Sequence, residues 1–151
     1  ISVEGVVTAV ESRGFFMQVP SDHSDFEGVD FSGLYVYLGN GDLTPPSAGQ
    51  LVKVSGEAGD FYGQKQLSNV TAIEALAEGV ALPTHELVSA ADVATGGPRA
   101  AALEGALVAL EGVTVTALEP EPGAGGRPDQ TRGRYAARPA PRDHQRRAHR
   151  Q

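Results

Sequence analysis

Residues 51–76 read LVKVSGEAGDFYGQKQLSNVTAIEAL, and this stretch decides the fold class. Over residues 52–55, valine alternates with lysine and serine, which is the period of a strand that has one buried and one wet face. A glycine-containing turn within residues 60–67 joins this strand to a second run, although residues 73–79 could equally begin a short helix. We therefore expect a β-hairpin in the middle of the chain. The apolar residues of its second strand are Leu67, Val70 and Ile73.

Three further short strands are expected before this hairpin. Residues 1–12 are rich in β-branched side chains, and Gly5 among them indicates a bulge or a sharp bend. The runs FFMQV at 15–19 and LYVYL at 34–38 have strong strand propensity. Residues 39–50 hold three glycines and two prolines, so we expect a loop there and no helix. Five short strands with a bent first strand predict a mainly β protein, built on the five-stranded Greek-key barrel called the OB-fold.

The residues after the barrel predict a short helix and a further β-hairpin. Thr84 follows a proline and is a candidate N-cap for a helix whose apolar positions extend to Ala94. Residues 102–118 read as two strands joined by a turn at Glu111 and Gly112, and they could begin a second OB-like segment. The expected domain boundaries are 1–78 for the barrel, 79–120 for the helix and hairpin, and 121–151 for a tail.

The formal net charge of −7 is divided unevenly along the chain. Residues 1–120 hold four basic and 16 acidic residues, whereas residues 121–151 hold eight arginines and three acidic residues. The second part has no Leu, Ile, Val, Phe or Met, so it cannot bury enough apolar surface to offset its ordering entropy. We expect a disordered Arg/Pro/Ala-rich tail. It is either a basic nucleic-acid-binding arm or the product of a frame change in a GC-rich coding sequence.

The composition also excludes several classes of site. The chain has no cysteine, which rules out disulfides, thiolate metal sites and cysteine nucleophiles. No run approaches the roughly 20 apolar residues of a membrane-spanning helix, so we expect no membrane partner. No nucleophile elbow, P-loop or HExxH motif is present, and we expect no enzyme activity. Because the chain begins inside an expected strand, it reads as a fragment or a processed product.

Several phrases, taken together, resemble one family. In chain order they are VEGVVTAV at 3–10, GFFMQVP at 14–20, GLYVYLG at 33–39, AGQLVKVSGEAGDFYGQKQL at 48–67 and LEGALVALEGVTVT at 103–116. This order is similar to the OB-fold module ahead of the catalytic domain in secreted bacterial nucleases of the endonuclease/exonuclease/phosphatase superfamily. The resemblance implies a non-catalytic, nucleic-acid-binding accessory module with an extracellular or periplasmic location. The nuclease domain that it would accompany is absent from this chain.

An OB-fold binds ligands on the face of its second and third strands and on the turns beside that face. There we expect rings that stack on bases, and basic or amide side chains that reach phosphates or base edges. One of Phe15 and Phe16 must point inward, because neighbouring side chains in a strand alternate between faces. The alternative for Phe61 and Tyr62 is that they brace the hairpin without contacting a ligand. The expected nucleic-acid-binding residues are Arg13, Phe16, Gln18, Tyr35, Tyr37, Phe61, Tyr62, Gln64 and Lys65.

The small number of basic residues limits the expected affinity for nucleic acid, and the sequence offers little for a metal site. Four basic residues neutralise few phosphates, so nucleic-acid binding should be weak and depend on stacking. His23 and His85 lack the spaced partners of a zinc site. The alternative function is a structural or protein-interaction module that docks or spaces a neighbouring catalytic domain. The acidic loop offers weak calcium candidates, although a solvated loop is the better interpretation and no cofactor is expected: Asp22, Asp25 and Asp30.

Overall fold

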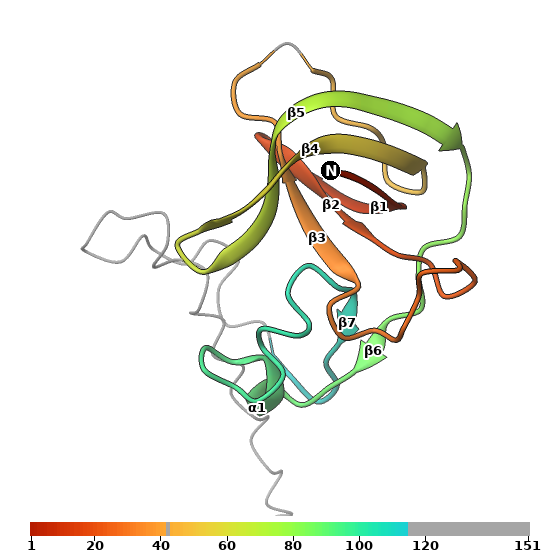
Figure 1. The fold of residues 1–151 in the computed structure, drawn as a ribbon. Coiled ribbons are helices and arrows are strands. Elements are labelled where there is room, and N and C mark those ends of the chain that lie inside the picture. The colour runs from red at the N-terminus through yellow and green to blue at the C-terminus, as the bar shows by residue number, and fades with distance from the viewer. Residues whose placement is uncertain (42, 115–151) are drawn as a thin grey trace, which may run out of the picture.

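The computed structural model describes residues 1–41 and 43–114, and its main feature is a closed β-barrel (Figure 1). Neighbouring strands follow the order β1-β2-β3-β5-β4, and β4 closes the barrel by pairing with β1. The prediction of a mainly β protein with a closed five-stranded barrel is therefore confirmed. The strands are β1 (Ser2–Glu11), β2 (Gly14–Gln18), β3 (Gly33–Tyr37), β4 (Leu51–Phe61) and β5 (Gln64–Ala77).

The strand pairing has the Greek-key arrangement. β1, β2 and β3 form an antiparallel meander, and β4 returns to lie antiparallel beside β1. β4 and β5 form a long antiparallel hairpin that extends beyond the barrel wall (Figure 1). β3 and β5 are parallel, and their ladder joins Tyr35 to Gln66 and Val36 to Leu67. This short parallel ladder, which we call the seam, is the shortest join in the barrel wall.

The core lies inside the barrel and receives side chains from all five strands. Strand alternation explains which ones: Val52 and Val54 are fully buried, whereas Lys53 between them reaches the outer face. Phe15 is likewise fully buried, and Phe16 lies on the other face, as the sequence predicts. The buried cluster consists of Val7, Phe15, Met17, Val36, Val52, Val54 and Leu67.

The bulge in β1 is not at the position that the sequence indicated. The register between β1 and β2 shifts between Val7 and Ala9, whereas residues 2–6 pair with β4 without a shift, so the expectation of a bulge at Gly5 is wrong. Gly5 instead lies where β1 passes closely over β2. A β-carbon there would lie 2.8 Å from Cε of Met17 and 3.0 Å from the carbonyl oxygen of Gln18. The glycine is therefore needed for close packing of the two strands.

Two further expectations about the barrel are decided by the structure. β5 continues in strand conformation to Ala77, where it pairs with β4, so the helical alternative for residues 73–79 is wrong. The ladder with β4 supplies the backbone partners that a helix would have supplied, and tertiary pairing decides the conformation. Residues 43–50, between β3 and β4, form a loop without a helix, as expected.

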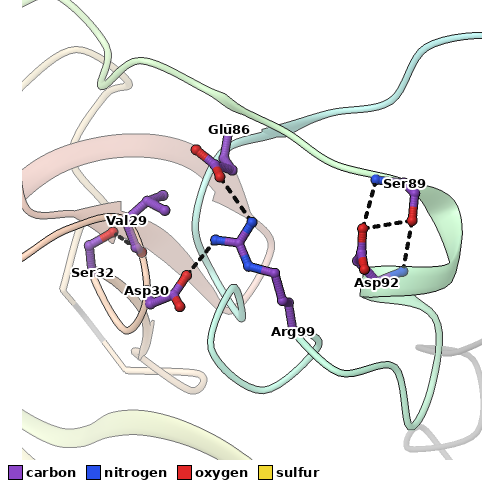
Figure 2. A network of polar contacts seen from close by, with 7 residues as sticks. All are labelled: Val29, Asp30, Ser32, Glu86, Ser89, Asp92 and Arg99. Carbon is purple, nitrogen blue, oxygen red and sulfur yellow. Dashed lines mark hydrogen bonds and ion pairs between the residues drawn. The ribbon is translucent and has the colours of Figure 1, made fainter.

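After the barrel, the chain forms β6 (Glu86–Leu87), α1 (Ala90–Val93) and β7 (Val108–Ala109). The short helix is confirmed, but its N-cap is Ser89 and not Thr84. Ser89 and Asp92 form a capping box, in which the Ser89 Oγ accepts the Asp92 N–H at 3.2 Å and the Asp92 carboxylate accepts the Ser89 N–H at 3.1 Å (Figure 2).

The further strand pair after the barrel is parallel. β6 pairs with β7, so the apolar run at 107–110 bonds to an earlier segment. The N–H groups of Glu86 and Val88 donate to the carbonyls of Leu107 and Ala109, which also explains why no helix begins near Thr84. The end of the predicted hairpin and the whole of the predicted tail, 121–151, lie outside the described residues.

Residues 99–107, which we call the seam segment, return to the barrel beside the seam. Figure 2 shows Arg99 between two carboxylates: its Nη2 lies 2.6 Å from Asp30, in the loop before β3, and its Nη1 lies 2.9 Å from Glu86 in β6. Leu103 is buried within the segment, and Gly105 lies against the start of β3. The seam segment therefore belongs to the same packed unit as the barrel.

Candidate functional site

The turn between β4 and β5 is built by its own backbone and by one carboxylate. Tyr62 and Gly63 have φ values of 53° and 90°, and positive φ at both central residues is the requirement of a type I′ turn. Asp60 accepts the Gly63 N–H at 2.7 Å and pairs with Nζ of Lys65 at 2.8 Å. These contacts fix the turn at the end of the hairpin, which Figure 1 shows projecting to the side of the barrel.

Tyr62 occupies a conformation that bulky residues avoid. The left-handed region costs an L-residue with a β-carbon about 1–2 kcal/mol, and asparagine and glycine are the residues preferred in such turns. Tyr62 receives little packing in return, because it is 78% exposed. Its ring meets that of Phe61 edge to face, with centroids 4.7 Å apart and an angle of 83°. Such a pair contributes about 0.5–1.5 kcal/mol, so the contact at most offsets the strain.

The charges at the turn are paired with each other. The hydrogen bond from Lys65, together with that from the Gly63 N–H, lowers the pKa of Asp60, and the hydrogen bond that Lys65 donates to this carboxylate raises the pKa of Lys65. Both side chains are exposed to solvent. Lys65 is therefore an ammonium group that already has an anionic partner, and a phosphate would compete with Asp60 for it.

The other three predicted rings lie on the barrel wall. Phe16 and Tyr35 pack against each other with ring centroids 4.9 Å apart, and Tyr35 is 5% exposed. Tyr37 is half-buried at the far end of β3. Arg13 is exposed in the turn at that same end, where its carbonyl accepts the N–H of Leu38 at 2.8 Å. Because β3 and β5 are parallel, Arg13 and Tyr37 lie at the end of β3 opposite the Tyr62 turn.

The two predicted glutamines are buried. Gln18 accepts the N–H of Leu107 at 2.9 Å through Oε1 and donates to Oγ of Ser32 at 3.1 Å through Nε2. Ser32 in turn donates to the carbonyl of Val29 at 2.7 Å, as Figure 2 shows. Gln64, at the start of β5, is also buried. Both side chains are therefore mostly removed from solvent, and the amide of Gln18 binds the seam segment through its hydrogen bond to Leu107.

Most basic side chains in the described part of the chain are in ion pairs. Lys53 lies 3.0 Å from Glu4, Lys65 pairs with Asp60, and Arg99 pairs with two carboxylates. The hydrogen bond with Lys53 lowers the pKa of Glu4, which keeps this pair ionised. Only Arg13, of the four basic residues before position 121, has no ion pair within residues 1–41 and 43–114.

The acidic loop offers no gathered set of metal ligands. Asp30 is engaged by Arg99, and Asp25 accepts the hydroxyl of Ser24 at 3.2 Å. Asp22 lies exposed in the same loop, and His23 approaches Glu4 at 3.5 Å. Among the residues that the structure describes, no group of three or more His, Asp or Glu side chains is arranged to hold a metal ion.

Sequence reasoning missed one exposed ring. Phe31 is 78% exposed and has a φ of 63°, so it shares both the exposure and the left-handed conformation of Tyr62. Its N–H donates to the carbonyl of Ala102 in the seam segment at 2.6 Å. The available signal was an aromatic residue in an acidic, polar loop, immediately before a strand.

Comparisons with known proteins add no relative. No family model, no curated protein and no solved structure matches the chain. Within the described ranges, no helix has the length and apolar character needed to cross a membrane.

Proposed function

We propose that this chain is a non-catalytic OB-fold accessory module of an extracellular nuclease, and that it binds single-stranded nucleic acid by stacking bases on the rings of the β4–β5 turn. The observation that carries the proposal is Tyr62, a large ring held in a strained left-handed conformation and left exposed at the end of the β4–β5 hairpin. Strain that folding does not require is a feature of residues that contact ligands.

The strand order supports the OB-fold part of the proposal. A five-stranded Greek-key barrel in which the β1–β2 and β4–β5 turns flank the β2–β3 face is the arrangement in which OB-folds bind oligonucleotides. The order of sequence phrases that resembles secreted nucleases supports the accessory role. The nuclease domain itself would be supplied by a longer protein or by a separate chain.

The charge distribution determines how such binding would behave. Ion pairs occupy three of the four basic residues before the Arg-rich segment, so few phosphates can be neutralised and few counterions released. Stacking contributes about 1–3 kcal/mol per base and needs no charge. We therefore expect weak binding to single strands, with little salt dependence in a chain that ends at residue 120.

The test is a titration with fluorescently labelled single-stranded oligonucleotides at low and physiological salt. Tyr62→Asn removes the ring but keeps a residue suited to positive φ, so the turn stays intact and affinity should fall by about tenfold or more. Tyr62→Phe keeps the ring and should bind like the wild type. Leu82→Asn, at an exposed apolar residue outside the barrel, is the matched control and should leave binding unchanged.

Two results would contradict the proposal. One is the absence of single-strand binding by the wild type at high micromolar protein concentration. The other is binding that Tyr62→Asn leaves unchanged. In either case the second candidate, a module that docks a neighbouring protein domain, becomes the better one. The specific observation that favours it is the excess of acidic residues over residues 1–120, 16 against four basic ones, together with the exposed rings, which suits a partner surface rich in lysine and arginine.

A further inference from the structure

We infer that Phe31 is a second contact ring of the same site, so that the ligand is an extended chain lying across the seam segment and not a single nucleotide. This inference rests on the proposed function. It adds a residue, a direction for the ligand and a minimum ligand length. None of these follows from the rings of the β4–β5 turn alone.

The parallel direction of β3 and β5 places Phe31 and Tyr62 at the same end of the barrel. Phe31 lies two residues before β3, and Tyr62 lies two residues before β5. Both residues precede the first residues of their strands. Both therefore lie in the segments that lead into two parallel strands.

The seam segment lies between these two positions. On the β3 side, Ala102 accepts the N–H of Phe31, and on the β5 side, the Glu104 carboxylate accepts the N–H of Lys65 at 3.3 Å. The segment therefore contacts the chain beside Phe31 through its backbone and the chain beside Tyr62 through the Glu104 side chain. Because it lies between the residues that carry the two rings, we expect a ligand that contacts both rings to extend across it, as a chain of several nucleotides can.

Two glycines lie where the seam segment meets β3. Gly33 and Gly105 meet backbone to backbone, since a β-carbon on Gly33 would lie 2.2 Å from the carbonyl carbon of Gly105. Leu103 is buried, and the Glu104 carboxylate accepts the Lys65 N–H. The seam segment therefore packs closely on β3, and its buried leucine does not add to the surface beside the two rings.

Phe31 meets the same physical criterion as Tyr62. Both are 78% exposed and both have positive φ, at 63° and 53° respectively. Bulky residues are genuine outliers in this region, where asparagine or glycine would be unstrained. Two such rings at one end of a barrel, on either side of one segment, are best explained by a shared ligand.

The experiment compares a dinucleotide with an oligothymidine of about eight residues, a length within the roughly 4–16 nucleotides that such barrels bind. Wild type, Phe31→Asn, Tyr62→Asn and the control Leu82→Asn are titrated as full-length chains. Phe31→Asn should weaken binding of the octamer about tenfold and leave dinucleotide binding unchanged. Tyr62→Asn should weaken binding of both. In parallel, the aromatic proton resonances of Phe31 in the wild type should shift when the octamer is added.

The outcomes separate the two claims. Octamer binding that survives Phe31→Asn but is lost in Tyr62→Asn would overturn the second ring and leave the proposed function standing. Phe31 resonances that do not move with saturating octamer would overturn it as well, without recourse to any variant. If the wild type binds neither oligonucleotide but binds a lysine-rich peptide through the same rings, the proposed function fails and the nucleic-acid inference fails with it.

Discussion

The barrel wall and the rim around the seam segment use aromatic residues in opposite ways. In the wall, Phe15 follows strand alternation, has an ordinary backbone and is fully buried against the core. At the rim, Phe31 and Tyr62 have left-handed backbones and are mostly exposed. A ring in the wall stabilises the fold through the apolar area that it buries. A ring at the rim buries little and imposes strain.

This difference separates residues that the fold requires from residues that it tolerates. Removing a wall residue should destabilise the protein, and removing a rim residue should leave stability unchanged or raise it. Four changes test this contrast through protein stability, and the expected change in stability becomes smaller from one to the next.

The largest effect is expected for Phe15→Ala. This change deletes a fully buried ring from the core inside the barrel, so the free energy of unfolding should fall by about 3–5 kcal/mol. Urea denaturation followed by circular dichroism measures the loss. A decrease in the free energy of unfolding of less than about 1 kcal/mol would mean that the fold depends no more on this wall residue than on the rim residues.

Gly33→Ala should produce the next largest effect. Its β-carbon would meet the backbone of Gly105 at 2.2 Å, so β3 and the seam segment must separate, with an expected loss of about 1–3 kcal/mol. Gly59→Ala is the matched control, because a β-carbon there meets nothing within 4 Å. Thermal unfolding of both variants tests the contact, and equal melting temperatures would show that the segment is not packed on β3.

Tyr62→Asn and Phe31→Asn should act in the opposite direction. Each replaces a strained ring by a residue that accepts positive φ, so the free energy of unfolding should stay unchanged or rise by up to about 1 kcal/mol. Denaturant midpoints measured beside the binding assays check this. A clear loss of stability in either variant would assign that ring to the fold and weaken its assignment to a ligand.

The smallest effect is expected from acid. Hydrogen bonds from Lys65 and Lys53 lower the folded-state pKa of Asp60 and Glu4, and the hydrogen bond from Ser89 lowers that of Asp92. Stability from these groups is therefore complete above their ordinary pKa values of 3.8 and 4.5 and is lost as the pH falls through the lowered values. The pairs are exposed, so melting temperature should decline gradually below about pH 5 and less steeply in high salt.

Much of the barrel could be predicted from the sequence because its signals are local. The alternation at 52–55, the apolar run at 15–19 and the prolines before β4 each reflect a short-range rule of strands and loops. Gly5 shows the limit of such rules. A glycine in a strand can serve a bulge or a close approach, and only the position of Met17 and Gln18 on the neighbouring strand decides between them.

The rim was less predictable because its geometry depends on distant residues. Phe61 and Gln18 were both reasonable candidates for contact with a ligand. Phe61 is exposed, whereas Gln18 is buried and accepts a hydrogen bond from the Leu107 N–H. No local pattern indicates that residues near 100 return to β3, and Phe31 gains its position only through that return. The β6–β7 pairing is of the same kind, since it joins segments far apart in the chain.

The hydrogen bond between Gln18 and Leu107 joins residues that are 89 positions apart, and this separation affects folding during synthesis. During synthesis the first three strands leave the ribosome long before the residues that cover their open side. Until residues 99–107 have been made, Oε1 of Gln18 lacks the Leu107 N–H as a partner and must bind water. The seam between β3 and β5 also has to form without the seam segment packed beside it. Closure of the cylinder should accordingly be a late, slow step, as expected for a topology with high contact order, and nascent chains stopped before residue 107 should remain sensitive to proteases.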